Sequence, residues 1–171
     1  MAISLADIEK AAERLRPVLH HTELDLSSTF SKMTGGKVYL KCENRQKTGS
    51  FKIRGASNKI AAMVERGEAA PVVASSAGNH AQGVACAAAK FSSPATIVMP
   101  KAAPIAKVQA TAGYGAKVVL HGDCYDDAKK LAEMVTAEFG ITDILIDYVG
   151  PVIGAHSGPG TLALFFLASE R

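Results

Sequence analysis

The sequence predicts an α/β protein built around a parallel β-sheet. Residues 71–146 alternate short apolar runs with helical stretches. The runs are continuous and rich in β-branched residues, as in strands that are buried on both faces of a parallel sheet. Strand–helix–strand units at this spacing imply right-handed crossovers between parallel strands. The composition agrees with a packed core, because 48% of the 171 residues are hydrophobic and only 20% are charged.

Local patterns define the individual elements. Apolar residues recur at helical spacing over residues 4–19, where Ser4 and Asp7 provide a start signal. Alternating side chains predict a half-buried strand over 37–42, and a second helix over 51–66 ends at Gly67. Further strands are predicted at 71–74, 95–99, 117–120 and 144–146, with helices at 79–90, 104–112 and 125–139 and the beginning of another at 161–171.

Several classes of protein are excluded by simple counts. The three cysteines are odd in number and widely spaced, which argues against a disulfide framework. Neither cysteines nor histidines have the spacing of zinc ligands, so no metal site is expected. The N-terminus lacks the pattern of a signal peptide, and no apolar run approaches the roughly 18 residues of a membrane span. We therefore expect a cytoplasmic protein that does not contact a membrane.

Basic residues concentrate between residues 37 and 59, where Glu43 is the single acidic residue. Such a cluster attracts phosphate, carboxylate or nucleic acid, or is an ordinary solvated face. Only Tyr39 and Phe51 interleave as aromatics, so a nucleic-acid partner is not expected. The basic residues are Lys37, Lys41, Arg45, Lys47, Lys52, Arg54 and Lys59.

The segment GSFKIRGA, residues 49–56, places Lys52 at the start of a helix between two glycines and beside Phe51. A lysine is disfavoured at the positive end of a helix dipole. The position is better explained if the amine is neutral or forms a Schiff base with a carbonyl cofactor. From these local features alone, an ordinary exposed lysine in the first turn is the simpler interpretation.

The segment ASSAGNHAQG, residues 74–83, follows a predicted buried strand and enters an alanine-rich helix. Small and short polar residues at this place are typical of a helix N-terminus that holds a carboxylate or a phosphate. N-capping by Ser76 or Asn79 explains one of these residues but not all of them. By contrast, residues 99–107 are explained as a purely structural turn in which Pro104 begins the next helix.

Three stretches together resemble one family, namely KCENRQKTGSFKIRGA (41–56), SSAGNHAQGVA (75–85) and MPKAAPIAKVQATAGYGAKVVLHG (99–122). They resemble the fold-type II pyridoxal-phosphate enzymes, specifically the threonine/serine dehydratase group that also contains serine racemase. The resemblance implies the tryptophan synthase β-like fold, a three-layer parallel sheet with a complete small domain and a partial large domain. The resemblance also argues against the interpretation of Lys52 as an ordinary exposed lysine.

By this resemblance Lys52 would form the Schiff base with pyridoxal 5'-phosphate and then remove the α-proton of the substrate. A desolvated lysine amine is a base of suitable strength for that step. Phe51 would pack beside the cofactor, and Asn79 would hydrogen-bond its ring hydroxyl. The substrate carboxylate would be held by the loop of Ser76, Ala77, Gly78, Asn79 and His80.

The reaction implied is β-elimination, which dehydrates and deaminates L-threonine and L-serine to a 2-oxo acid and ammonia. A homo-oligomer acting in amino-acid metabolism, such as isoleucine biosynthesis, is expected. Serine racemases have a second serine where this sequence has Ala77, so a dehydratase is favoured over a racemase. The main alternative is a catalytically inactive, shortened chain that binds a partner protein, and serine racemase is a lesser alternative.

The resemblance also divides the chain. Residues 1–49 correspond to the first part of the large domain, 50–150 to the small inserted domain, and 151–171 to the start of the remaining large domain. The glycine-rich run that surrounds the cofactor phosphate is missing from the sequence. We therefore expect a chain shortened within the large domain, with weaker affinity for the cofactor because several charge-assisted hydrogen bonds are lost together.

Overall fold

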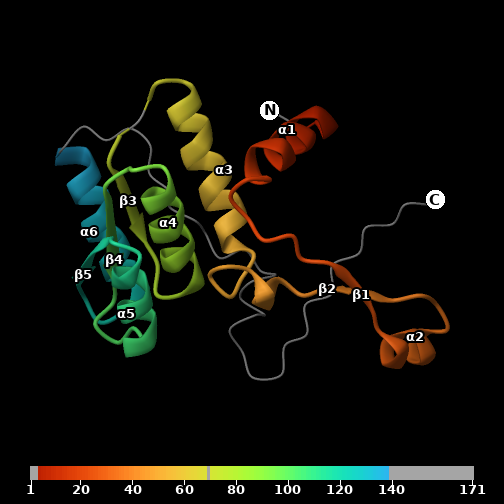
Figure 1. The fold of residues 1–171 in the computed structure, drawn as a ribbon. Helices are drawn as coiled ribbons and strands as arrows, with labels where there is room; N and C mark the ends of the chain where they lie inside the picture. The colour runs from red at the N-terminus through yellow and green to blue at the C-terminus, as the bar shows by residue number, and fades with distance from the viewer. Residues whose placement is uncertain (1–3, 69, 139–171) are drawn as a thin grey trace.

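The computed structural model describes residues 4–68 and 70–138 (Figure 1). The predicted strand at 144–146 and the predicted helix at 161–171 lie outside the described residues, and the division into three parts stays a prediction. In chain order the elements are α1 (Leu5–Leu15), β1 (Leu24–Leu26), α2 (Ser28–Thr34), β2 (Tyr39–Lys41), the 3-10 helix η1 (Glu43–Arg45), α3 (Lys52–Glu65), β3 (Val72–Ser75), α4 (Asn79–Lys90), β4 (Ala95–Met99), α5 (Ile105–Gly113), β5 (Lys117–Leu120) and α6 (Tyr125–Glu138).

The predicted parallel sheet is present, with strand order β3–β4–β5. Val72 lies opposite Ala95 in the first pair of strands, and Thr96 lies opposite Lys117 in the second. Every residue of β3 is buried, whereas β5, at the edge of the sheet, is half-buried or exposed. The continuous apolar runs of β3 and β4 are therefore explained by helices on both faces of the sheet.

Two helical layers cover the sheet. Ile97 and Met99 of β4 belong to a core cluster that also contains residues of α3 and α4. Val98, which lies between them, packs instead against Ala128 and Ala132 of α6. Neighbouring strand residues therefore face opposite layers, as the pleat of a strand requires. Figure 1 shows the result, with α6 on one side of the sheet and α4 and α5 on the other.

The N-terminal part contains elements that the sequence did not reveal. β1 and β2 form an antiparallel pair in which Leu24 lies opposite Lys41, and α2 connects them. A three-residue strand and a seven-residue helix are too short for a clear periodicity. The alternation predicted over 37–42 is confirmed, since Val38, Leu40 and Cys42 are half-buried and the residues between them are exposed.

The first helix begins as predicted but ends early. Ser4 Oγ accepts a hydrogen bond from the Asp7 N–H, and Asp7 Oδ2 accepts one from the Ser4 N–H at 2.9 Å, which completes a capping box. The helix ends at Leu15 and not at residue 19, because Pro17 disfavours a continued helix. Of the described helices, none is both long and apolar enough to cross a membrane.

Candidate functional site

The two loops singled out from the sequence each precede a helix, and these helices pack against each other. Lys52 is the first residue of α3, and Asn79 is the first residue of α4. The two helices approach each other closely at Gly83, because a Cβ built there would lie 3.1 Å from both the Ile53 nitrogen and the Lys52 carbonyl carbon. The second turn of α4 therefore packs against the backbone that carries Lys52.

A tight turn leads into Lys52. Gly49 has a φ of +70°, in the left-handed region that favours glycine, and its N–H donates to the Gln46 carbonyl at 2.8 Å. The side chain of buried Ser50 accepts a hydrogen bond from the Lys52 N–H at 3.4 Å. The Lys52 Nζ lies 5.4 Å from the centroid of the Phe51 ring, within the range of a cation–π contact. The turn, the hydroxyl and the ring together restrict where the Lys52 amine can lie.

The loop between β3 and α4 has a different arrangement from ordinary N-capping. Gly78 is the N-cap residue of α4, and no side chain caps this helix. The Ser76 hydroxyl accepts from the Gly78 N–H at 3.3 Å, and the Ser76 N–H donates to the Val98 carbonyl at 3.1 Å. Capping by Ser76 or Asn79 is therefore wrong as an explanation of this segment.

Asn79 contacts a residue that the sequence analysis missed. Its Oδ1 accepts a hydrogen bond from Lys107 Nζ at 2.5 Å. Lys107 lies in the first turn of α5, whose N-cap is Pro104. The interpretation of residues 99–107 as a purely structural turn was incomplete. A signal was available, because a lysine in the first turn of a helix is unfavourable with the helix dipole.

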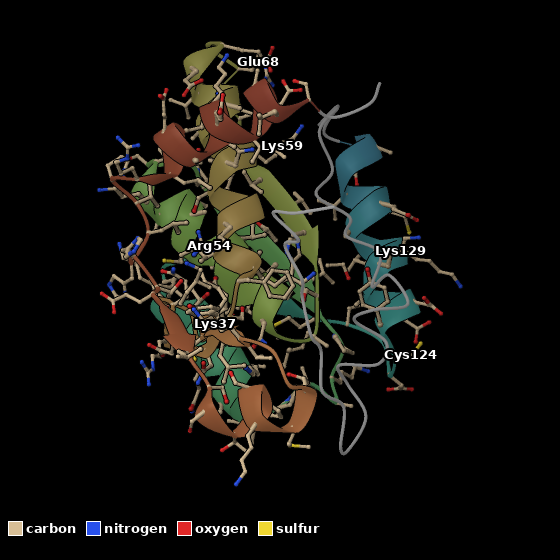
Figure 2. The ribbon with its side chains drawn as sticks, turned by 90° about the vertical axis from the view of Figure 1, so that its right-hand side faces the viewer. Lys37, Arg54, Lys59, Glu68, Cys124 and Lys129 are labelled. Atoms are coloured by element: carbon tan, nitrogen blue, oxygen red, sulfur yellow. The ribbon has the colours of Figure 1, made fainter. Side chains whose placement is uncertain are left out.

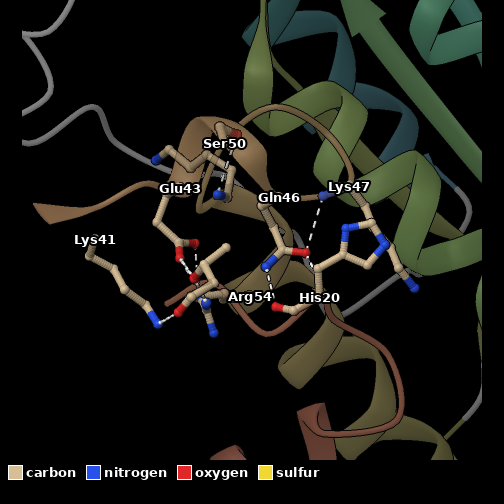
Figure 3. Close-up of polar contacts among 9 residues, drawn as sticks. His20, Lys41, Glu43, Gln46, Lys47, Ser50 and Arg54 are labelled. Atoms are coloured by element: carbon tan, nitrogen blue, oxygen red, sulfur yellow. Dashed lines mark hydrogen bonds and ion pairs between the residues drawn. The ribbon is translucent and has the colours of Figure 1, made fainter. Parts of the chain in front are cut away.

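A charged network holds the first turn of α3 in place (Figure 3). Arg54 donates from Nε and Nη2 to the two carboxylate oxygens of Glu43, each at 2.8 Å. Thr22 Oγ1 donates to the same carboxylate at 2.6 Å. The hydrogen bonds from Arg54 and then Thr22 lower the pKa of Glu43, against the opposing effect of burial. The network fixes the start of α3, and with it Lys52, to η1 and to the segment around Thr22.

Other members of the basic cluster also bind protein groups. Lys41 donates to the Thr22 carbonyl, and Lys47 donates to the Val18 carbonyl. Arg45 forms a more exposed ion pair with Asp25. Figure 2 shows Lys37 and Arg54 near the N-terminal segments and α3, away from Lys129 and Cys124 at α6. Structural contacts therefore explain much of the local excess of positive charge.

A shallow depression of about 360 Å³ lies beside the N-terminal segment, and none of the predicted site residues lines it. Within residues 4–68 and 70–138, no cluster of three or more His, Cys, Asp or Glu side chains is arranged to hold a metal ion. The depression is lined by His20, His21, Thr22, Glu23, Asp25, Cys42 and Arg45.

The residues around Lys52 and Asn79 fit a cofactor that carries an aldehyde and an anionic group. A half-buried lysine amine condenses with an aldehyde, and the first-turn N–H groups of α4 have no carbonyl partner within the helix. A Cβ built at Gly78 meets no described atom within 4 Å, so space is open beside this loop. Within the described part of the chain, the buried hydroxyls of Thr48 and Ser75 have no hydrogen-bond partner. Both flank the two loops and provide further donors.

Relatives with descriptive names resemble most of the chain. The L-threonine ammonia-lyase of Thermotoga maritima is 49% identical over 164 residues, which is 95% of this chain and 40% of the relative. A threonine deaminase of known structure, from the organism abbreviated T.th., is 35% identical with a TM-score of 0.74, over 90% of this chain and 48% of that one. Maize serine racemase is also 35% identical, with a TM-score of 0.76 over 86% and 44% of the two chains.

This chain thus spans less than half the length of these relatives. The similarity to the solved structures confirms the fold class that the resemblance implied, within the described residues. Residues 15–149 match the family described as "Pyridoxal-phosphate dependent enzyme", which also confirms the predicted cofactor. The positions and contacts of the site residues agree with this sequence similarity. The chain belongs to the family of pyridoxal-phosphate dependent enzymes.

Proposed function

We propose that this protein acts as an ammonia-lyase that converts L-threonine, and also L-serine, to a 2-oxo acid and ammonia. The observation that carries the proposal is the packing of α4, at Gly83, against the backbone of Lys52, which supports a shared site for the lysine and the loop before Asn79. The names of the relatives support the threonine specificity. In the net reaction, the Cα proton and the Cβ hydroxyl leave as water, and a water is consumed when ammonia is released.

When bound, pyridoxal phosphate withdraws electron density from the Cα of the amino acid that is joined to its aldehyde. Lys52 would bind that aldehyde in the resting protein and, once released from it, accept the Cα proton at Nζ. Phe51 would restrict the amine by its contact with Nζ. Ser50 and the Arg54–Glu43 pair would hold the backbone from which Lys52 reaches the substrate.

The substrate carboxylate would bind at the start of α4. N–H groups at a helix N-terminus point outward and carry partial positive charge, which favours an anion. Ser76, Ala77, Gly78 and His80 would surround it, and Asn79 would donate to the oxygen of the ring hydroxyl of the cofactor. The open space beside Gly78 supports this assignment.

Elimination is favoured over racemisation because the side chain of Ala77 has no group that can donate a proton to Cα. A racemase needs an acid on the face of the substrate opposite the lysine. The similarity to serine racemase keeps racemisation as a lesser alternative. D-serine formed from L-serine as fast as ammonia is released would establish racemisation and refute the preference for elimination.

Borohydride trapping tests the role of Lys52 directly. After incubation with pyridoxal phosphate and reduction, we expect a covalent adduct on the peptide that contains Lys52, detected by mass spectrometry. Lys52→Ala should lose both this adduct and the release of ammonia from L-threonine. Lys101→Ala is the matched control, because Lys101 is an exposed lysine before α5 and should leave both unchanged.

Two results would contradict the proposal. An adduct distributed over many lysines in the wild-type chain would show unspecific modification. No adduct at any lysine would favour the interpretation as an inactive chain that binds a partner. The expected homo-oligomer, the cytoplasmic location and a role in isoleucine biosynthesis stay predictions.

A further inference from the structure

The contact between Lys107 and Asn79 determines which way the Asn79 amide faces. An asparagine side chain has one accepting oxygen and one nitrogen with two donor hydrogens, whereas a lysine ammonium only donates. The hydrogen bond of 2.5 Å therefore requires the oxygen, Oδ1, to face Lys107. The Nδ2 group, on the other branch of the planar amide, is left to donate elsewhere.

Lys107 is itself held firmly by α5. Its N–H donates to the Pro104 carbonyl at 2.8 Å, and its carbonyl accepts from the Thr111 hydroxyl at 2.7 Å. Thr111 is fully buried, so this second bond anchors Lys107 to the core. The side chain of Lys107 is half-buried and extends from the start of α5 to the start of α4. Each of these two helices follows a neighbouring parallel strand, which places both starts at the same edge of the sheet.

We propose that Lys107 is a positioning residue that fixes the Asn79 amide so that Nδ2 donates to an anionic oxygen of the ligand. This inference rests on the proposed function, in which that oxygen is the oxygen of the pyridoxal ring hydroxyl. The positive charge on Lys107 also polarises the amide, and chains of hydrogen bonds strengthen one another in this way. Lys107 thus makes Asn79 a better donor without touching the ligand.

The first test needs no cofactor. In the wild-type protein, the side-chain amide of Asn79 should give two separate proton signals with slow solvent exchange in nitrogen-edited NMR spectra. Lys107→Met removes the donor while keeping a long side chain, and we expect faster exchange and shifted signals. Lys101→Met is the control, and it should leave the Asn79 signals unchanged. Lys107→Leu also removes the donor, and it replaces the methionine variant if that variant does not fold.

The second test measures the affinity for pyridoxal phosphate. The loss of one charge-assisted hydrogen bond corresponds to about a tenfold change in affinity. Lys107→Met and Asn79→Ala should each weaken binding by about this factor, and the double variant should be little weaker than either single variant. Lys107→Arg keeps the charge and the donor, and it should restore most of the affinity.

The outcomes separate the two proposals. If Asn79→Ala weakens binding but Lys107→Met changes neither the affinity nor the NMR signals, the positioning role is refuted and the proposed function stands. Effects of the two single variants that multiply in the double variant would also refute it, because the residues would then act independently. If the wild-type chain traps no cofactor at Lys52, the proposed function fails, and the NMR comparison alone decides whether Lys107 fixes Asn79.

Discussion

At the scale of single residues, Glu43 carries a half-buried charge that we expect to stabilise the fold. Its carboxylate accepts hydrogen bonds from Arg54 and Thr22, and its side chain is only 17% exposed. Glu43→Gln keeps the shape but places an amide donor against these donors. We expect the free energy of unfolding to fall by about 1–3 kcal/mol at pH 7, as measured by urea unfolding.

The effect of Glu43→Gln should depend on pH in a defined direction. Because the pKa of Glu43 is lowered in the folded protein, its stabilising contribution is fully present above the ordinary glutamate pKa of about 4.3. That contribution is lost as the pH falls through the lower folded pKa. The difference between wild type and variant should therefore be constant near neutral pH and shrink below about pH 4.

A surface glutamate provides the comparison for this experiment. Glu133 on α6 pairs with Lys129 at 3.5 Å and is 44% exposed. Glu133→Gln should cost less than about 0.5 kcal/mol. If both variants cost equally little, the network around Glu43 does not stabilise the fold.

Some residues of the candidate site could be predicted from the sequence, and others could not. Roles for Lys52 and Asn79 were predicted because their segments, GSFKIRGA and SSAGNHAQGVA, resemble those of one enzyme family. Lys107 and Glu43 were missed, because their partners lie 28 and 11 residues away and are fixed only by tertiary packing. Spacing along the chain contains no information about such contacts until the order of strands is known.

At the scale of elements, the approach of α3 to α4 depends on the missing side chain of Gly83. A Cβ at this position would meet backbone atoms of Lys52 and Ile53, which cannot move aside without shifting α3. Alanine normally stabilises a helix by about 1 kcal/mol relative to glycine, but overpacking costs about 1–3 kcal/mol. We expect Gly83→Ala to lower the urea midpoint and to reduce trapping of pyridoxal phosphate at Lys52.

Gly55 offers a matched substitution on the other helix. It lies within α3, and a Cβ built there meets no described atom within 4 Å. Gly55→Ala should therefore raise the urea midpoint and leave the trapping unchanged. Equal stabilisation by both alanines would show that the two helices tolerate a wider separation.

The elements that were predicted best lie in the region where short apolar runs alternate with helical stretches. The bounds of α4, β4 and β5 agree with the sequence prediction to the residue. β1 and α2 were missed because most of their residues are exposed, so no apolar repeat marks them. The end of α1 was misplaced because the apolar spacing continues past Pro17, while the helix does not.

At the scale of the whole molecule, Gln46 joins the N-terminal segment to the loop before Lys52. Its buried amide donates to the His20 carbonyl and accepts from the His20 N–H, each at 2.9 Å. Gln46→Ala removes both bonds and should cost about 1–3 kcal/mol. Hydrogen–deuterium exchange should become faster at residues 18–22 and change little in β3 and β4.

An exposed glutamine supplies the control for that experiment. Gln109 lies on α5 and is solvent-exposed. Gln109→Ala should change neither the exchange pattern nor the stability by more than about 0.5 kcal/mol. Uniformly faster exchange in Gln46→Ala would mean that the N-terminal segment and the sheet unfold as one unit.

The helical layer formed by α6 has an exposed cysteine beside it that can be labelled chemically. Cys124 stands exposed just before α6, the helix that covers the face opposite α3 and α4. Cys86 is half-buried within α4, and burial raises the pKa of its thiol, which leaves less of the reactive thiolate. Cys42 is also half-buried, so a maleimide dye would attach first at the exposed Cys124. The fluorescence of this dye would come from the α6 side of the sheet, whereas Lys52 lies in α3 on the other side.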